Sequence, residues 1–196
     1  RLGDEDDATF SAALAAAAPK TGWYGMDLLG DNVTQSAMYN PVMSEDLNIV
    51  TMWYNMNGKY YDGRIHHRVR LEQTQEWTIT HAPVTEVGSF KSHNWHLHGE
   101  HFQIVRAIDA HGISWSASPT NDWVAGDWRD IISVPRNGSV VVRWRPTLHT
   151  GLLLHHCHVY NHESAGLKEM IMVVNCSTGA IAKLNAHCSG NDVWPW

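Results

Sequence analysis

The sequence is poor in charged residues and contains no long apolar run. Only 17% of its 196 residues are charged, and the net charge of −6 comes without a basic stripe, so nucleic acid is not an expected partner. No stretch approaches the roughly 18 apolar residues of a membrane span. Residues 1–4 lack the apolar core of a signal peptide, and we therefore expect a processed product or a fragment.

Cysteine is scarce too, and the three cysteines differ in their surroundings. Cys176 and Cys188 stand near the C-terminus and are spaced to close a loop by a disulfide, whereas Cys157 lies between histidines. A disulfide implies an oxidising compartment. The N-x-[ST] sequons that agree with this begin at Asn32, Asn137 and Asn175. We expect a secreted, extracellular or luminal glycoprotein.

Short β-like segments, separated by glycine, proline and asparagine, fill the chain from residue 46 onward. They predict an all-β, Greek-key sandwich or barrel with a C-terminal tail over residues 46–196. Residues 1–45 are predicted to be an N-terminal extension or the remnant of a preceding domain, of mixed or irregular structure, with a short helix at 8–18. The predicted strands are 47–54, 68–71, 76–80, 102–108, 131–134, 139–144, 152–155 and 167–174. Residues 135–138 are expected to join two of them as a hairpin.

Histidine is abundant, with 14 residues, and seven metal-binding candidates stand in two motifs about sixty residues apart. The H-x-x-H-x-H motif consists of His93, His96 and His98, and the H-C-H-x-x-x-H motif consists of His156, Cys157, His158 and His162. Side chains alternate between the faces of a strand. The Cys157 thiolate should therefore lie back to back with the imidazoles of His156 and His158, which would join two metal sites through a few covalent bonds.

A thiolate with two imidazoles is the ligand set of blue-copper centres, and Cys157, His93 and His162 supply it. Zinc accepts the same ligands, but a structural zinc site would not need four further histidines. We expect packing or surface roles for the histidines outside the motifs, which are His66, His67, His81, His111, His149 and His187. His101 and His155 stand beside the motifs and are expected to support the ligands or to pack.

With these motifs, residues 47–175 resemble the last cupredoxin domain of multicopper oxidases such as laccases and ferroxidases. The resemblance implies a type 1 copper on His93, Cys157 and His162. It further implies a type 2 copper on His96 and a type 3 pair on His98, His156 and His158, with up to four copper ions in all. Leu167 falls at the axial position, where many relatives have methionine. Because leucine cannot coordinate, we expect a relatively high reduction potential.

The resemblance implies an oxidoreductase that takes single electrons from a reducing substrate at the type 1 copper and reduces dioxygen to water at a trinuclear cluster. In the family, two further H-x-H pairs come from an N-terminal domain, and both such pairs in this sequence are already assigned. We therefore expect another chain or domain to complete the cluster, and this chain to be inactive alone. The substrate stays open between a phenol or aromatic amine, as for laccases, and ferrous iron, as for ferroxidases. Ferrous iron would need carboxylates near His93 or His162, and Glu100 and Glu163 are expected to be exposed charges.

Three alternatives stay open. A blue-copper electron-transfer protein would use the thiolate site alone and would leave four histidines unexplained. A copper nitrite reductase would not need paired histidines beside its cysteine. A protein that has lost its metals would stay colourless after copper loading.

Overall fold

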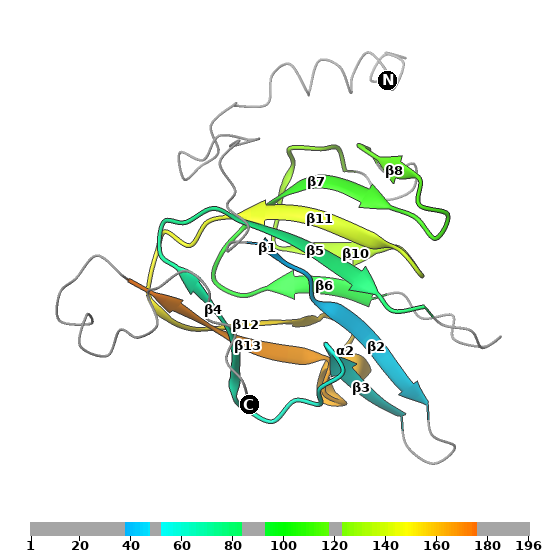
Figure 1. The fold of residues 1–196 in the computed structure, drawn as a ribbon, viewed down its shortest axis with the longest axis horizontal. Helices are drawn as coiled ribbons and strands as arrows, with labels where there is room; N and C mark the ends of the chain where they lie inside the picture. Colours follow the sequence, from blue (N-terminus) through cyan, green and yellow to red (C-terminus); the bar gives the residue numbers. More distant parts are fainter. Residues whose placement is uncertain (1–37, 48–51, 84–92, 118–122, 176–196) are drawn as a thin grey trace, which may run out of the picture.

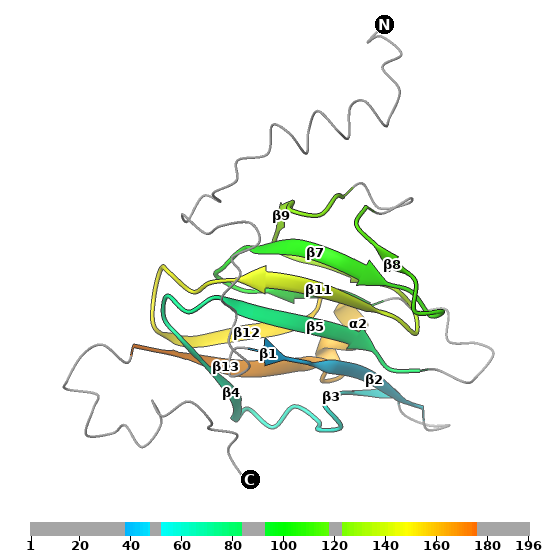
Figure 2. The same ribbon diagram turned by 45° about the horizontal axis from the view of Figure 1, so that its top comes forward.

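Two packed β-sheets make up the part of the chain that the computed structural model describes, which is residues 38–47, 52–83, 93–117 and 123–175 (Figures 1 and 2). The all-β prediction is confirmed. Among these residues, no helix is both long and apolar enough to cross a membrane. The predicted helix at 8–18, Cys176, Cys188, Asn32 and His187 lie outside the described residues.

The larger sheet has eight strands, in the order β3-β2-β5-β11-β7-β8, with β1 beside β5 and β9 beside β7. Its strands are β1 (Met38–Tyr39), β2 (Val42–Leu47), β3 (Met52–Met56), β5 (Gln75–His81), β7 (Phe102–Ile108), β8 (Ser114–Trp115), β9 (Trp128–Arg129) and β11 (Ser139–Trp144). The sheet takes in residues 38–45, which the sequence placed in the extension. Predicted strand 47–54 is divided between β2 and β3, which pair antiparallel with each other.

The smaller sheet has five strands, in the order β10-β6-β12-β13-β4. They are β4 (Ile65–Arg70), β6 (His93–Leu97), β10 (Ile131–Val134), β12 (Gly151–Cys157) and β13 (Lys168–Val174). One short helix, α2 (Tyr160–Ser164), connects β12 to β13. Both histidine motifs therefore belong to the smaller sheet and its α2 connection.

Alternating burial explains how the two sheets face each other. In β5, every second residue from Gln75 to His81 is buried, and β13 alternates in the same way. Trp77, Trp95 and Trp144 are all fully buried between the sheets. The ring of Trp77 lies 5.0 Å from that of Trp144 and 6.0 Å from that of Trp95, centre to centre. These large rings fill the core immediately behind the cysteine-bearing strand.

The predicted hairpin at residues 135–138 is wrong. Strand β10 pairs with β6 in the smaller sheet, whereas β11 pairs with β5 and β7 in the larger one. The turn carries the chain from one sheet to the other, and it is closed by the Gly138 amide, which donates to the Pro135 carbonyl at 2.9 Å. A Cβ at Gly138 would collide with the carbonyl oxygen of Ile108, so this crossing requires glycine.

Candidate metal centre

The two histidine motifs lie on neighbouring strands. Strands β6 and β12 run antiparallel, with His156 opposite His96 and Cys157 opposite Trp95. His93 and Cys157 are fully buried and face the core, as the alternation of side chains requires. The strand pairing therefore brings together residues about sixty positions apart, and it gives each motif an inner and an outer face.

On the inner face, a thiol and two imidazoles converge. The Sγ atom of Cys157 lies 3.7 Å from Nδ1 of His93 and 3.5 Å from Nδ1 of His162, and the two Nδ1 atoms are 3.2 Å apart. All three side chains are at most 2% exposed. The structure thus brings together the three residues that the sequence predicts for the blue-copper site, and we call this group the thiol site.

Backbone hydrogen bonds hold the loop that carries His162. The amide of His162 donates to the carbonyl of Val159 at 2.9 Å, within α2. The amide of Leu167 donates to the carbonyl of His162, and the amide of Cys157 donates to the carbonyl of Leu167, both at 3.0 Å. The side chain of Leu167 is fully buried. Two ligand candidates and the predicted axial residue are therefore tied together by successive main-chain bonds.

The spacing of the thiol site suits a single metal ion. Metal bonds of about 2.0–2.3 Å to nitrogen and sulfur place neighbouring ligand atoms about 3.3–3.8 Å apart in trigonal or tetrahedral geometry. The two sulfur–nitrogen separations of 3.5 and 3.7 Å lie in this range, and the nitrogen–nitrogen separation of 3.2 Å falls just below it. The soft sulfur favours copper or zinc over magnesium or calcium. The donor set therefore fits the ion that the sequence resemblance implies.

The remaining four histidines gather on the outer face of the same strands. One ligand nitrogen from each of His96, His98 and His156 lies within 4.8 Å of the others. Nε2 of His98 is 2.8 Å from Nε2 of His156. The ring of His158 lies 5.2 Å from that of His96 and 5.7 Å from that of His156, centre to centre. We call these four residues the outer histidine cluster.

Hydrogen bonds orient two rings of the outer histidine cluster. Nδ1 of His96 lies 2.7 Å from the carbonyl oxygen of Asp130, and Nδ1 of His156 lies 2.9 Å from the carbonyl oxygen of Cys157. A carbonyl only accepts, so each Nδ1 must carry the proton, which leaves the Nε2 lone pair for a ligand role. His156 is thereby bonded back to the residue that bears the thiol.

Desolvation favours neutral imidazoles in this cluster. It is the main cause that lowers the pKa of His98 below 6.5, and the neighbouring His96 lowers it further. Burial also lowers the pKa of His156, although its hydrogen bond to the Cys157 carbonyl opposes this shift. Neutral imidazole is the form that binds metal ions. For His98 and His156, desolvation therefore favours the ligand-competent form.

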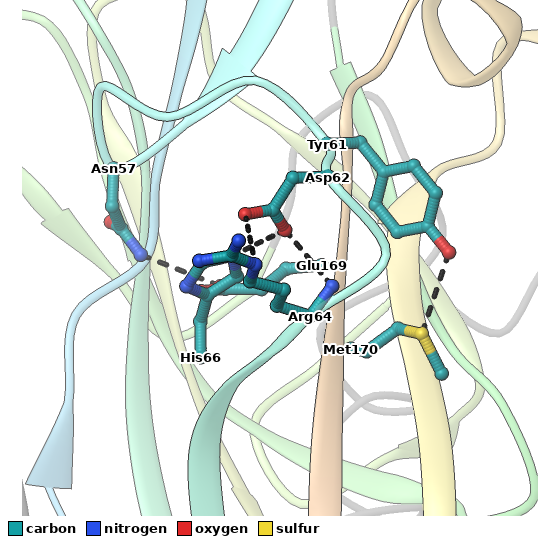
Figure 3. Close-up of polar contacts among 7 residues, drawn as sticks. All are labelled: Asn57, Tyr61, Asp62, Arg64, His66, Glu169 and Met170. Atoms are coloured by element: carbon teal, nitrogen blue, oxygen red, sulfur yellow. Dashed lines mark hydrogen bonds and ion pairs between the residues drawn. The ribbon is translucent and has the colours of Figure 1, made fainter. Parts of the chain in front are cut away.

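A buried polar chain behind Cys157 was not evident in the sequence. The indole N–H of Trp95 donates to Nδ1 of His155 at 3.1 Å, and Nε2 of His155 lies 3.2 Å from a carboxylate oxygen of Glu169. The side chain of Asn57 donates to the same carboxylate at 3.4 Å, as Figure 3 shows. His155 is fully buried, as befits the predicted packing role. The chain ties β6 to β12 and β13 around the motifs.

Several other predictions can be placed. The prediction for Glu100 is wrong: its side chain is 2% exposed, because one carboxylate oxygen accepts from the amides of Thr147 and Leu148. Glu163 is partly exposed and lies 3.5 Å from Nδ1 of His156. His66 pairs with Asp62 at 2.9 Å, and Met170 accepts from the Tyr61 hydroxyl at 3.4 Å (Figure 3). His111 and His149 are exposed, in line with a surface role, whereas His101 is exposed and does not show the packing that was predicted for it.

Residues 32–176 match the multicopper oxidase family, which is most of the chain. This chain belongs to the multicopper oxidase family. The fold agrees: a crystal structure of a multicopper oxidase from Pediococcus acidilactici superposes with a TM-score of 0.58 and 26% identity, over 75% of this chain and 27% of that one. Membership implies copper, and it places the chain in a family of oxidoreductases.

Two curated relatives illustrate the range of this multicopper oxidase family. A laccase from Cryphonectria parasitica is 29% identical over 140 residues, which covers 61% of this chain and 22% of the laccase. An iron multicopper oxidase from Mycosarcoma maydis is 31% identical over 103 residues, which covers 49% of this chain and 16% of the relative. The chain thus spans less than a quarter of the length of either relative.

Proposed function

We propose that this chain is the C-terminal, copper-binding part of a laccase-like multicopper oxidase. One observation carries the proposal: the Cys157 thiol converges with two imidazoles on one side of a strand, while its neighbours His156 and His158 join a second group of imidazoles on the other side. Bound copper ions would supply the one-electron transfers that connect a reducing substrate to dioxygen.

Specific residues would hold the ions. His93, Cys157 and His162 would bind the type 1 copper, and the buried setting of all three would exclude water from it. The outer histidine cluster would supply the type 2 ligand, His96, and three type 3 ligands, His98, His156 and His158. The peptide bonds beside Cys157, together with the hydrogen bond from His156 to the Cys157 carbonyl, would connect the two groups.

The outer histidine cluster has an open side that would suit a partner. His98 and His158 are exposed. On the same face lie Leu152, which is 52% exposed, and Ile131, which pairs with His96 and is 37% exposed. We propose that another domain or chain, bearing two H-x-H pairs, covers these apolar side chains and completes the cluster. Without it, the chain should bind copper at the thiol site but should not reduce dioxygen.

Copper titration of the full chain tests the proposal. Wild-type protein should develop a copper–thiolate absorption band, and Cys157→Ser should abolish it while leaving the fold intact by circular dichroism. His66→Gln, which replaces a partly buried histidine outside both motifs in the same smaller sheet, is the matched control and should keep the band. A band that survives in Cys157→Ser would refute the thiol-site assignment.

Counting bound metal separates the remaining alternatives. One copper per chain, even after a partner with two H-x-H pairs is added, would support the electron-transfer protein. Further copper that binds only with the partner, together with oxygen consumption, would support the oxidase.

We propose a phenol or aromatic amine as the substrate. A greater oxygen uptake with ferrous iron would favour the ferroxidase, and the Mycosarcoma maydis relative is named an iron multicopper oxidase. A secreted or luminal location stays a proposal.

A further inference from the structure

We propose that Tyr54 and His81 are positioning residues that hold the two imidazoles of the thiol site in their metal-binding orientation. Neither residue belongs to a histidine motif. Each lies flat against one ligand candidate, and both come from the larger sheet, across the sandwich from the strand that carries Cys157. This inference rests on the proposed copper role of the thiol site.

His81 stacks on His93. The two ring centres are 4.4 Å apart and the ring planes differ by 30°. Nδ1 of His81 lies 2.8 Å from the carbonyl oxygen of Ala82, and the His81 amide donates to the carbonyl of Gly138 at 2.9 Å. His81 is 1% exposed. Its ring is therefore held by its own hydrogen bond, so that it offers His93 a fixed flat surface.

Tyr54 stacks on His162 in the same way. Their ring centres are 4.3 Å apart with an interplanar angle of 26°, and the Tyr54 ring also lies 6.1 Å from the His93 ring, nearly perpendicular to it. The Tyr54 amide donates to the carbonyl of Ala165 at 3.2 Å, which fastens β3 to the end of α2. Tyr54 is 1% exposed. The ring and its backbone thus hold both the His162 imidazole and the helix that carries it.

The stacking contacts restrict the rotation of the His93 and His162 imidazoles. The χ2 torsion of histidine has broad minima, so an unsupported imidazole can turn its Nδ1 away from a metal. Here both Nδ1 atoms point towards Cys157 Sγ, at 3.7 Å for His93 and 3.5 Å for His162. A flat neighbour on each ring resists that rotation through ring stacking. The geometry of the thiol site would therefore depend on packing between the two sheets.

Paired substitutions separate the flat ring from other properties of each residue. Tyr54→Phe keeps the ring, whereas Tyr54→Leu keeps apolar bulk without it. His81→Phe keeps the ring, whereas His81→Asn keeps a side-chain donor for the Ala82 carbonyl without it. Copper affinity, the copper–thiolate absorption and the electron paramagnetic resonance spectrum are measured on each full-length protein. Thermal unfolding of the metal-free proteins reports whether each variant folds.

The ring-keeping variants should retain wild-type affinity and spectra. Each ring-removing variant should bind copper about two- to tenfold more weakly, the range expected from one aromatic contact, and should show a shifted resonance spectrum. Equal affinity and equal spectra within both pairs would overturn the inference. If one variant fails to fold, the comparison within the other pair of substitutions tests the inference. Absence of a thiolate band in the wild type would instead refute the proposed function.

Discussion

Acid should destabilise the fold through His67, which is partly buried with its ring 5.8 Å from that of Trp77. Burial lowers the pKa of His67 from 6.5 to about 4, a shift that Glu169 opposes and His155 reinforces. In the unfolded chain, the pKa of His67 returns to its ordinary value of 6.5. Between these two values the unfolded state binds a proton that the folded state does not, so stability falls as the pH falls through this window.

The size of the effect follows from the two pKa values. For pKa values of 6.5 unfolded and about 4 folded, the linkage relation gives a loss of about 2 kcal/mol between about pH 7.5 and about pH 5. The contribution stops growing below the folded pKa, because both states are then protonated. A loss of this size is a large part of the stability of a typical domain.

Urea denaturation of the metal-free full chain at the two pH values measures the loss. His67→Gln stays neutral throughout, so its stability should fall by about 2 kcal/mol less than that of the wild type. His66→Gln, on the same strand, controls for the replacement of a histidine in β4. Equal losses in the wild type and His67→Gln would refute the lowered pKa of His67.

Three further changes test other parts of the structure. Trp95→Phe removes the indole donor to His155 and should cost about 1–3 kcal/mol, whereas Trp144→Phe, whose indole nitrogen has no hydrogen-bond partner among the described residues, should cost less by urea denaturation. Equal costs would contradict the role of that bond. Gly138→Ala should cost about 1–3 kcal/mol because a Cβ meets the Ile108 carbonyl, and a neutral result would show that the turn has room. Leu167→Met should lower the reduction potential of the copper-loaded thiol site, measured by redox titration, and an unchanged potential would place residue 167 away from the metal.

Local patterns predicted the strands well but not their partners. The predicted limits of β7, β10 and β11 agree with the structure. The turn at residues 135–138 looked like a hairpin because turn chemistry is local, whereas the choice of sheet depends on which neighbours bury each strand. Glu100 looked like an exposed charge for a similar reason, since the amides of Thr147 and Leu148 that it binds lie far away in the sequence.

The two motifs by themselves determined the chemistry of the site. The spacing around Cys157 dictates that a thiol and its two neighbouring imidazoles lie on opposite faces of an extended strand, whatever the rest of the chain does. Only the tertiary structure decided that the imidazoles of His93 and His162 lie within 3.7 Å of the thiol, and that Tyr54 and His81 stack against them. Those contacts join separate strands and two sheets, and burial of the shared core, rather than any local preference, brings them together.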